Sequence, residues 1–150
     1  MATSSVITEE MRKSIGVELV SHTTKVELGA IKRFAEAIGD TNPLYHDEVQ
    51  ARKSRYGSVV APPTFYRSLG GLTLNLPFAV PLTRVLDGGT VWEYFEPVRP
   101  GDAITASAKI ADLSQRSGRM GTMLFIFYET AYKNQLGQLT AKSRSTIIRY

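Results

Sequence analysis

The sequence predicts a single domain of the α+β class, with helices in its first half and antiparallel strands in its second. Two observations lead to this prediction. Up to residue 70 the apolar residues recur with helical spacing, whereas from residue 85 onward they alternate with the period of two that strands require. The chain of 150 residues, 43% of them hydrophobic, also has the usual size of one domain. We therefore expect residues 1–150 to form one long central helix wrapped by a curved antiparallel sheet.

The first half contains helical segments separated by turn-forming residues, with one short β-rich piece between them. Each helix is indicated by apolar residues three or four positions apart, or by capping residues at its ends. The expected elements are a helix at residues 8–14, a strand at 23–27, and helices at 28–38, 47–53 and 62–70. The helix at 28–38 carries one continuous apolar stripe, and Gly39 marks its end.

The second half predicts four strands separated by turns rich in Gly, Pro, Asn and Ser. They are expected at residues 90–96, 103–113, 120–132 and 139–150. The third of them is apolar on both faces, because Phe125 and Phe127 point one way while Ile126 and Tyr128 point the other. Such a strand belongs in the centre of a sheet, covered by a helix on one side and by a second layer or subunit on the other. We therefore expect at least a dimer, with the functional site near the subunit boundary.

Composition removes several classes of function. The chain has no cysteine and two histidines, so thiolate chemistry is absent and a metal site is not expected. The net charge of +4 is scattered and interleaved with acids, which argues against nucleic acid as a partner. No signal peptide and no stretch of ~20 apolar residues is present, so we expect a cytoplasmic protein with no membrane segment. Phosphate-binding loops and a serine nucleophile elbow also lack their motifs.

One segment carries residues suited to proton transfer. Asp40 and His46 lie within seven residues of each other, on a turn that leaves the helix at 28–38. Such a turn fixes the directions of both side chains, as general acid and base catalysis requires. A second interpretation is structural: Asp40 caps the turn and His46 is a surface residue beside acids.

The same segment resembles the motif of MaoC-like and (R)-specific enoyl-CoA hydratases, Gly-Asp-x-Asn-Pro-(Leu/Ile)-His. Residues 39, 40, 42, 43 and 44 match, and His46 comes one residue late because Tyr45 intervenes. Residues 59–65, 98–102 and 118–137 are similar to the FAS1-like, or N-terminal MaoC, dehydratase branch of this family. Together these matches cover most of the chain from Thr24 onward.

The resemblance implies a hot-dog fold and the reversible hydration of 2-enoyl thioesters to (R)-3-hydroxyacyl thioesters, with no cofactor. The substrate would be an acyl-CoA or an acyl-carrier-protein thioester. Asp40 and His46 would activate a water molecule, and Asn42 would brace their turn. The family stabilises the thioester oxygen with a main-chain N–H at a helix start, and here the first one available after two prolines is that of Thr64.

Two departures from the family pattern leave alternatives open. Tyr45 is an extra residue, and Pro62-Pro63-Thr64 replaces the His-Gly of active hydratases. We expect an active enzyme in which the His46 imidazole lies within one water's reach of the Asp40 carboxylate, both facing the cleft beside the Thr64 N–H. The expected assembly is a homodimer or a heterodimer with another MaoC-like subunit. In the alternative, Tyr45 occupies the histidine's place, and the chain is a non-catalytic partner that shapes the acyl tunnel of a heteromeric dehydratase. A hot-dog thioesterase is a third option, against which the Asp-x-Asn-Pro turn speaks.

Overall fold

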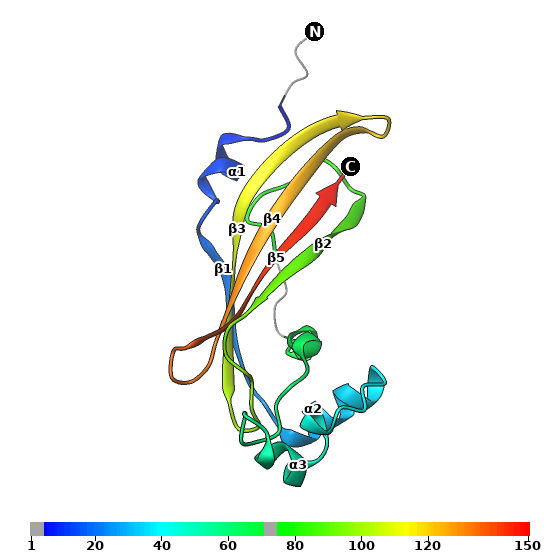
Figure 1. Cartoon of the computed structure of the whole chain (residues 1–150). Coiled ribbons are helices and arrows are strands. Elements are labelled where there is room, and N and C mark those ends of the chain that lie inside the picture. Colours follow the sequence, from blue (N-terminus) through cyan, green and yellow to red (C-terminus); the bar gives the residue numbers. More distant parts are fainter. Residues whose placement is uncertain (1–4, 71–74) are drawn as a thin grey trace.

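The computed structural model describes residues 5–70 and 75–150 and confirms the α+β hot-dog fold (Figure 1). All the paired strands join one antiparallel sheet, in the order β1-β3-β4-β5-β2. The elements, in chain order, are α1 Glu9–Lys13, β1 Glu18–Lys25, α2 Leu28–Ala37, the 3-10 helix η1 Pro43–Tyr45, α3 Glu48–Lys53, the 3-10 helix η2 Pro63–Ser68, β2 Val85–Tyr94, β3 Ala103–Gly118, β4 Gly121–Lys133 and β5 Leu139–Arg149.

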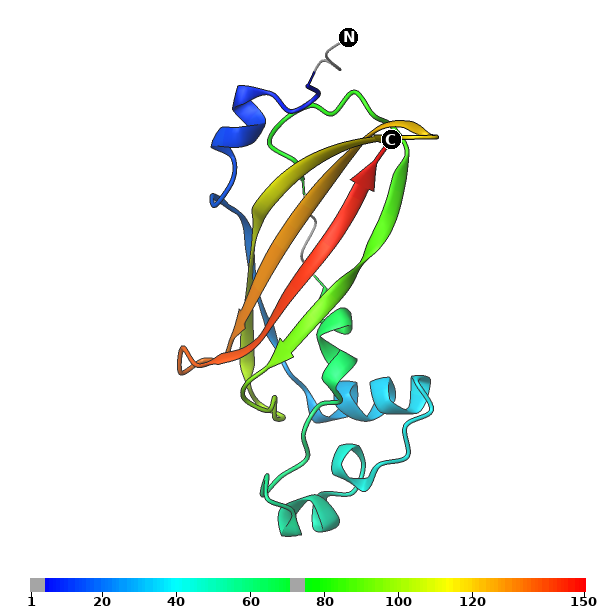
Figure 2. The same cartoon turned by 45° about the horizontal axis from the view of Figure 1, so that its top comes forward.

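The long strands build the sheet and give it its curvature, which is visible in both views (Figures 1 and 2). β4 lies in the centre, paired with β3 on one side and β5 on the other, so the central position predicted for the third strand of the second half is confirmed. β2 forms one edge. It begins five residues earlier than predicted, because a bulge between Asp87 and Thr90 lets the strand continue past Gly88 and Gly89.

The helices lie differently from the expected single long helix. α2 has 10 residues and lies with α3 beyond one end of the sheet (Figure 2). Its buried side chains are Ile31 and Ala35, and Ile31 belongs to a core that α2 shares with η2 and the end of the sheet. The apolar stripe of α2 is therefore buried against other short helices. Gly39, with a φ of 69°, turns the chain away at the end of α2.

The segment that packs on the inner face of the sheet is η2. Phe65 and Tyr66 of η2, together with Leu69 directly after it, are buried against strand residues at the end of the sheet where the helices lie. A second core lies near the other end, where Met11 of α1 and Phe78 cover strand residues of β3 and β4. No helix in residues 5–70 or 75–150 has the length and apolar character needed to cross a membrane.

Candidate active site

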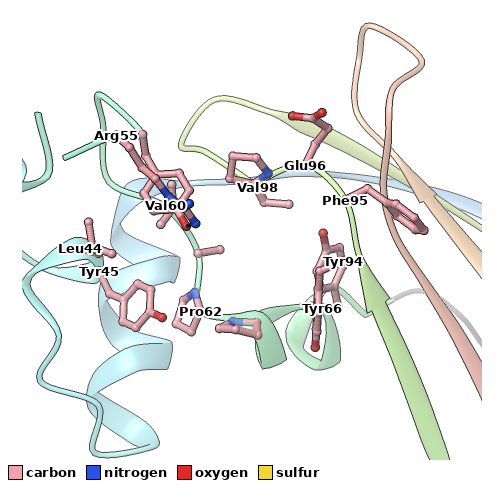
Figure 3. Close-up of a pocket in the computed structure, with 14 residues that line it drawn as sticks. Leu44, Tyr45, Arg55, Val60, Pro62, Tyr66, Tyr94, Phe95, Glu96 and Val98 are labelled. Atoms are coloured by element: carbon pink, nitrogen blue, oxygen red, sulfur yellow. Dashed lines mark hydrogen bonds between the residues drawn. The ribbon is translucent and has the colours of Figure 1, made fainter.

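A cavity of about 320 Å³ opens where the helical end meets the edge strand β2. Its lining comes from four parts of the chain: the η1 turn, the loop after α3, the start of η2, and the end of β2 with the loop that follows it (Figure 3). The size suits a small ligand or one arm of a larger one. Because Tyr94 of β2 is part of the lining, the cavity reaches the edge of the sheet.

The turn that carries Asp40 is held by its own side chains. The Asp40 Oδ1 atom accepts a hydrogen bond of 2.9 Å from the Asn42 N–H, and the Asn42 Oδ1 atom accepts one of 3.1 Å from the Leu44 N–H. Pro43 then starts η1 with the backbone angle that a helical turn needs. Asn42 therefore braces the turn, and one Asp40 oxygen is already engaged in the same task.

His46 lies against the main chain of Asp40. Its Nε2 atom is 2.6 Å from the Asp40 carbonyl oxygen, so Nε2 must carry the proton and donate it. The side chain is half-buried and lies outside the lining of the cavity. The sequence predicted that the Asp40 and His46 side chains face the cleft together. In the structure neither residue lines the cavity, and the contact between them runs from the imidazole to a main-chain carbonyl oxygen.

Tyr45 takes the position that faces the cavity, with its ring and hydroxyl directed into it (Figure 3). Burial raises the pKa of this phenol above its usual value, and the negative charge of Asp40 raises it further. Tyr45 and His46 point in different directions because successive residues of a 3-10 turn are about a third of a turn apart. Tyr45 therefore lies near Asp40 as a neutral phenol.

Thr64 is exposed and stands next to the lining of the cavity, to which Pro62 and Pro63 contribute. Neither proline has an N–H, and the Phe65 N–H is bonded to the Pro62 carbonyl at 2.9 Å. Thr64 thus offers the first main-chain N–H of η2 that remains for a ligand. The role predicted for Thr64, donation of its N–H to the thioester oxygen, stays a prediction.

No motif in the sequence indicated Arg55 or Tyr56 as site residues, but the fold places both in the lining of the cavity. The Arg55 Nη2 atom donates a hydrogen bond of 2.6 Å to the Tyr56 hydroxyl, and its guanidinium lies 4.8 Å from the centre of the same ring. This contact fixes the exposed guanidinium of Arg55 in the lining of the cavity. Among the described residues, no three His, Cys, Asp or Glu side chains gather in a way that would hold a metal ion.

Comparison with known proteins relates most of the chain to one family. The model of the FAS1-like dehydratase domain region matches residues 13–143. A UPF0336 protein of Streptomyces griseus is 37% identical over 93 residues, which are 59% of this chain and 62% of that protein. The chain thus matches a little under two thirds of the length of this relative.

Two solved structures have a similar fold. The MaoC-like dehydratase of Rhodospirillum rubrum has a TM-score of 0.73 at 24% identity, over 91% of this chain and 92% of that one. The ChsH1-ChsH2 complex of Mycobacterium tuberculosis contains a chain with a TM-score of 0.74 at 22% identity, over 89% of this chain and 84% of that one. At these identities the likeness concerns the fold alone.

Proposed function

Because this chain belongs to the FAS1-like dehydratase domain family, we propose that it is the acyl-thioester-binding subunit of a MaoC-like hydratase or dehydratase, beside a sister subunit that supplies the catalytic base. The observation that carries this proposal is that Tyr45, and not His46, lines the cavity. In the family motif the residue directly after Leu44 is histidine, so the tyrosine stands where the catalytic imidazole would stand.

The chemistry of hydration explains why this exchange matters. Water adds across the C2–C3 double bond of an enoyl thioester only if a base takes one of its protons. A free imidazole has a pKa of about 6.5 and is an effective base at neutral pH, whereas a phenol has a pKa of about 10. The pKa of Tyr45 is raised above that value. Tyr45 can therefore hold a water or a carbonyl by a hydrogen bond, but it is a poor base.

The cavity suits the arm of a thioester. Its walls are largely apolar side chains, such as Leu44, Val60 and Val98, and Arg55 adds an exposed cation to the lining. Coenzyme A and the carrier-protein arm both carry phosphate groups, which guanidinium groups bind well. We propose that Arg55 contacts such a phosphate while the acyl part enters the cavity.

Replacing Arg55 by alanine is expected to weaken the affinity for trans-2-dodecenoyl-CoA by about tenfold, since one exposed charge-assisted contact is lost. Titration calorimetry on the purified chain measures this change. The matched control is Arg116→Ala, which removes an exposed arginine of β3 outside the cavity lining. Equal affinities for the two variants would remove Arg55 from the binding site.

The sister subunit is proposed to pair along β2. Within residues 5–70 and 75–150 this edge strand pairs with β5 alone, and it exposes apolar side chains, with Val91 at 70% and Val85 at 52% of their surface. Exposed apolar edges of this kind are usually covered in the assembled protein. Pairing there would also bring a neighbouring subunit to Tyr94, in the wall of the cavity.

Without a sister subunit we expect two copies of the chain to pair along the same edge. In sedimentation at micromolar concentration the wild-type chain should then be a dimer and Val91→Lys mostly monomer, because a charge at the centre of the edge opposes pairing. Val49→Lys serves as control: Val49 lies on α3 with 62% of its surface exposed, so this variant should stay dimeric. A wild-type monomer, or two variants of equal mass, would argue against assembly through β2.

A complete hydratase is the second candidate, and one observation favours it. The His46 imidazole lies 2.6 Å from the main-chain carbonyl oxygen of Asp40, the residue that carries the carboxylate, so both members of the predicted pair belong to one compact turn. Under this reading, Asp40→Asn and His46→Gln would each lower the turnover of the chain by ~10²–10⁴.

A further inference from the structure

A second hollow of about 330 Å³ lies on the inner face of the sheet, and Tyr66 contributes to its lining as well as to that of the cavity. We call it the polar groove. Its walls include His22 of β1, Arg67 of η2, Thr130 of β4, and Ser143 and Ser145 of β5. The polar groove thus lies next to the cavity, separated from it by one aromatic side chain.

The composition of the polar groove is unusual for the inner face of a sheet. Further along β4 the same face carries Leu124 and Ile126, both fully buried, but here Thr130 and Ser143 are buried with 7% and 4% of their surface exposed. Burying a hydroxyl costs free energy unless a partner satisfies it. The Ser143 hydroxyl bonds the Tyr132 phenol, so Thr130 is the buried hydroxyl of this face that a polar occupant of the groove could meet.

The groups of the polar groove are mostly hydrogen-bond donors. Arg67 can only donate, and the Thr130 hydroxyl and a His22 ring N–H can donate as well, whereas the Ser145 hydroxyl shares a hydrogen bond of 3.0 Å with Thr90 and the Ser143 hydroxyl bonds the Tyr132 phenol. None of the described residues in its lining is acidic. Burial raises the pKa of the Tyr132 phenol, and the hydrogen bond from Ser143 and the positive charge of Arg67 oppose that rise.

An aromatic wall connects the two hollows. The ring of Trp92 lies 5.6 Å from that of Tyr66 and 5.7 Å from that of Tyr132, with angles of 30° and 28° between the ring planes. Trp92 also lies parallel to Tyr94, at 6.1 Å and 6°, and Tyr94 lines the cavity. The rings of Tyr66, Trp92, Tyr94 and Tyr132 thus form one cluster that borders both hollows.

We propose that the polar groove receives the distal part of the acyl group and selects acyl groups that carry acceptor oxygens there, as a keto group or a carboxylate. This inference rests on the proposed function, because it assumes that the cavity binds an acyl thioester. A plain alkyl chain would cover the donors without satisfying them, which weakens binding. An acceptor oxygen accepts hydrogen bonds from the same groups.

Titration calorimetry of the purified full chain with three thioesters tests the proposal: dodecanoyl-CoA, its terminal keto derivative and its ω-carboxy derivative. At least one oxygenated thioester should bind about tenfold tighter than dodecanoyl-CoA. If only the carboxylate gains affinity and Arg67→Gln removes the gain, the groove selects a charged end. Equal gains for both derivatives identify a neutral acceptor as sufficient.

The variant Thr130→Val removes a hydroxyl at nearly constant volume and should abolish most of the preference, by weakening the binding of the oxygenated thioesters relative to dodecanoyl-CoA. Thr122→Val, on the same strand outside the groove lining, should keep the preference. Equal or tighter binding of dodecanoyl-CoA by the wild-type chain would overturn the inference and leave the proposed function standing. If none of the three thioesters binds, the proposed function itself fails, and this inference fails with it.

Discussion

Replacing Tyr45 by histidine is expected to give the chain a hydratase activity at least ~10² above that of the wild-type chain, the usual contribution of a well-placed base. The new imidazole would follow Leu44 directly, as in the family motif, and would point into the cavity where the Tyr45 ring now lies. It would also lie near Asp40, whose charge already acts on the residue at this position. The measurement is the rate of hydration of trans-2-dodecenoyl-CoA by the purified variant.

Two further variants separate a gain of a base from a change in shape. Tyr45→Phe keeps the ring without any basic atom and should stay inactive. Adding Asp40→Asn to Tyr45→His should remove most of the gained activity, since the carboxylate is then lost. A Tyr45→His variant that binds the thioester normally and hydrates none of it would show that position 45 is not the place of the missing base.

Replacing Phe65 by alanine is expected to lower the free energy of unfolding by about 3–4 kcal/mol, the usual cost of removing a buried phenylalanine ring. Phe65 has 3% of its surface exposed and makes an edge-to-face contact with Phe34 of α2, with the ring centres 5.6 Å apart. It thereby fastens η2 to α2, and η2 begins with two prolines that line the cavity.

Urea denaturation of the Phe65→Ala variant measures this loss, and Phe95→Ala provides the comparison. Phe95 has 51% of its surface exposed, so its removal should change the free energy of unfolding by less than about 1 kcal/mol. Similar values for the two variants would contradict the view that η2 is part of the main core.

The strand half of the fold was predictable because its signal is local. The alternation of residues in β4 identified it as the central strand, and the antiparallel order follows from short turns between β3, β4 and β5. β2 was placed too late because Gly88 and Gly89 favour a turn, whereas in the sheet they form a bulge. A side chain at Gly88 would come within 2.9 Å of Thr146, so the glycine is needed for close approach.

The helix predicted at residues 28–38 was placed nearly correctly, but its partner was not. An apolar stripe indicates that one face of a helix is buried, but it does not indicate which surface covers that face. Here α2 packs at the end of the sheet with η2, a contact between segments about thirty residues apart that local periodicity does not report.

The sequence predicted the part of the candidate site that one turn forms. It did not predict the part that several distant segments of the chain form together. Asp40 and Asn42 make the expected turn, because their side chains bond the next main-chain N–H groups. The direction of Tyr45 relative to His46 depends on the geometry of η1, which the motif alone does not give. Arg55, Tyr66 and Tyr94 reach the cavity from three separate elements and carry no shared sequence signal.

We propose that this chain binds an enoyl thioester without hydrating it, because Tyr45 occupies the place of the base. The most direct measurement follows the loss of the conjugated enoyl group of trans-2-dodecenoyl-CoA, with the wild-type chain in excess and no other subunit present. We predict saturable binding and a hydration rate equal to that of buffer, which rises when a MaoC-like sister subunit with its own acid-base pair is added. Turnover by the chain alone that Asp40→Asn and His46→Gln each reduce by ~10² or more would contradict the claim and assign catalysis to that pair.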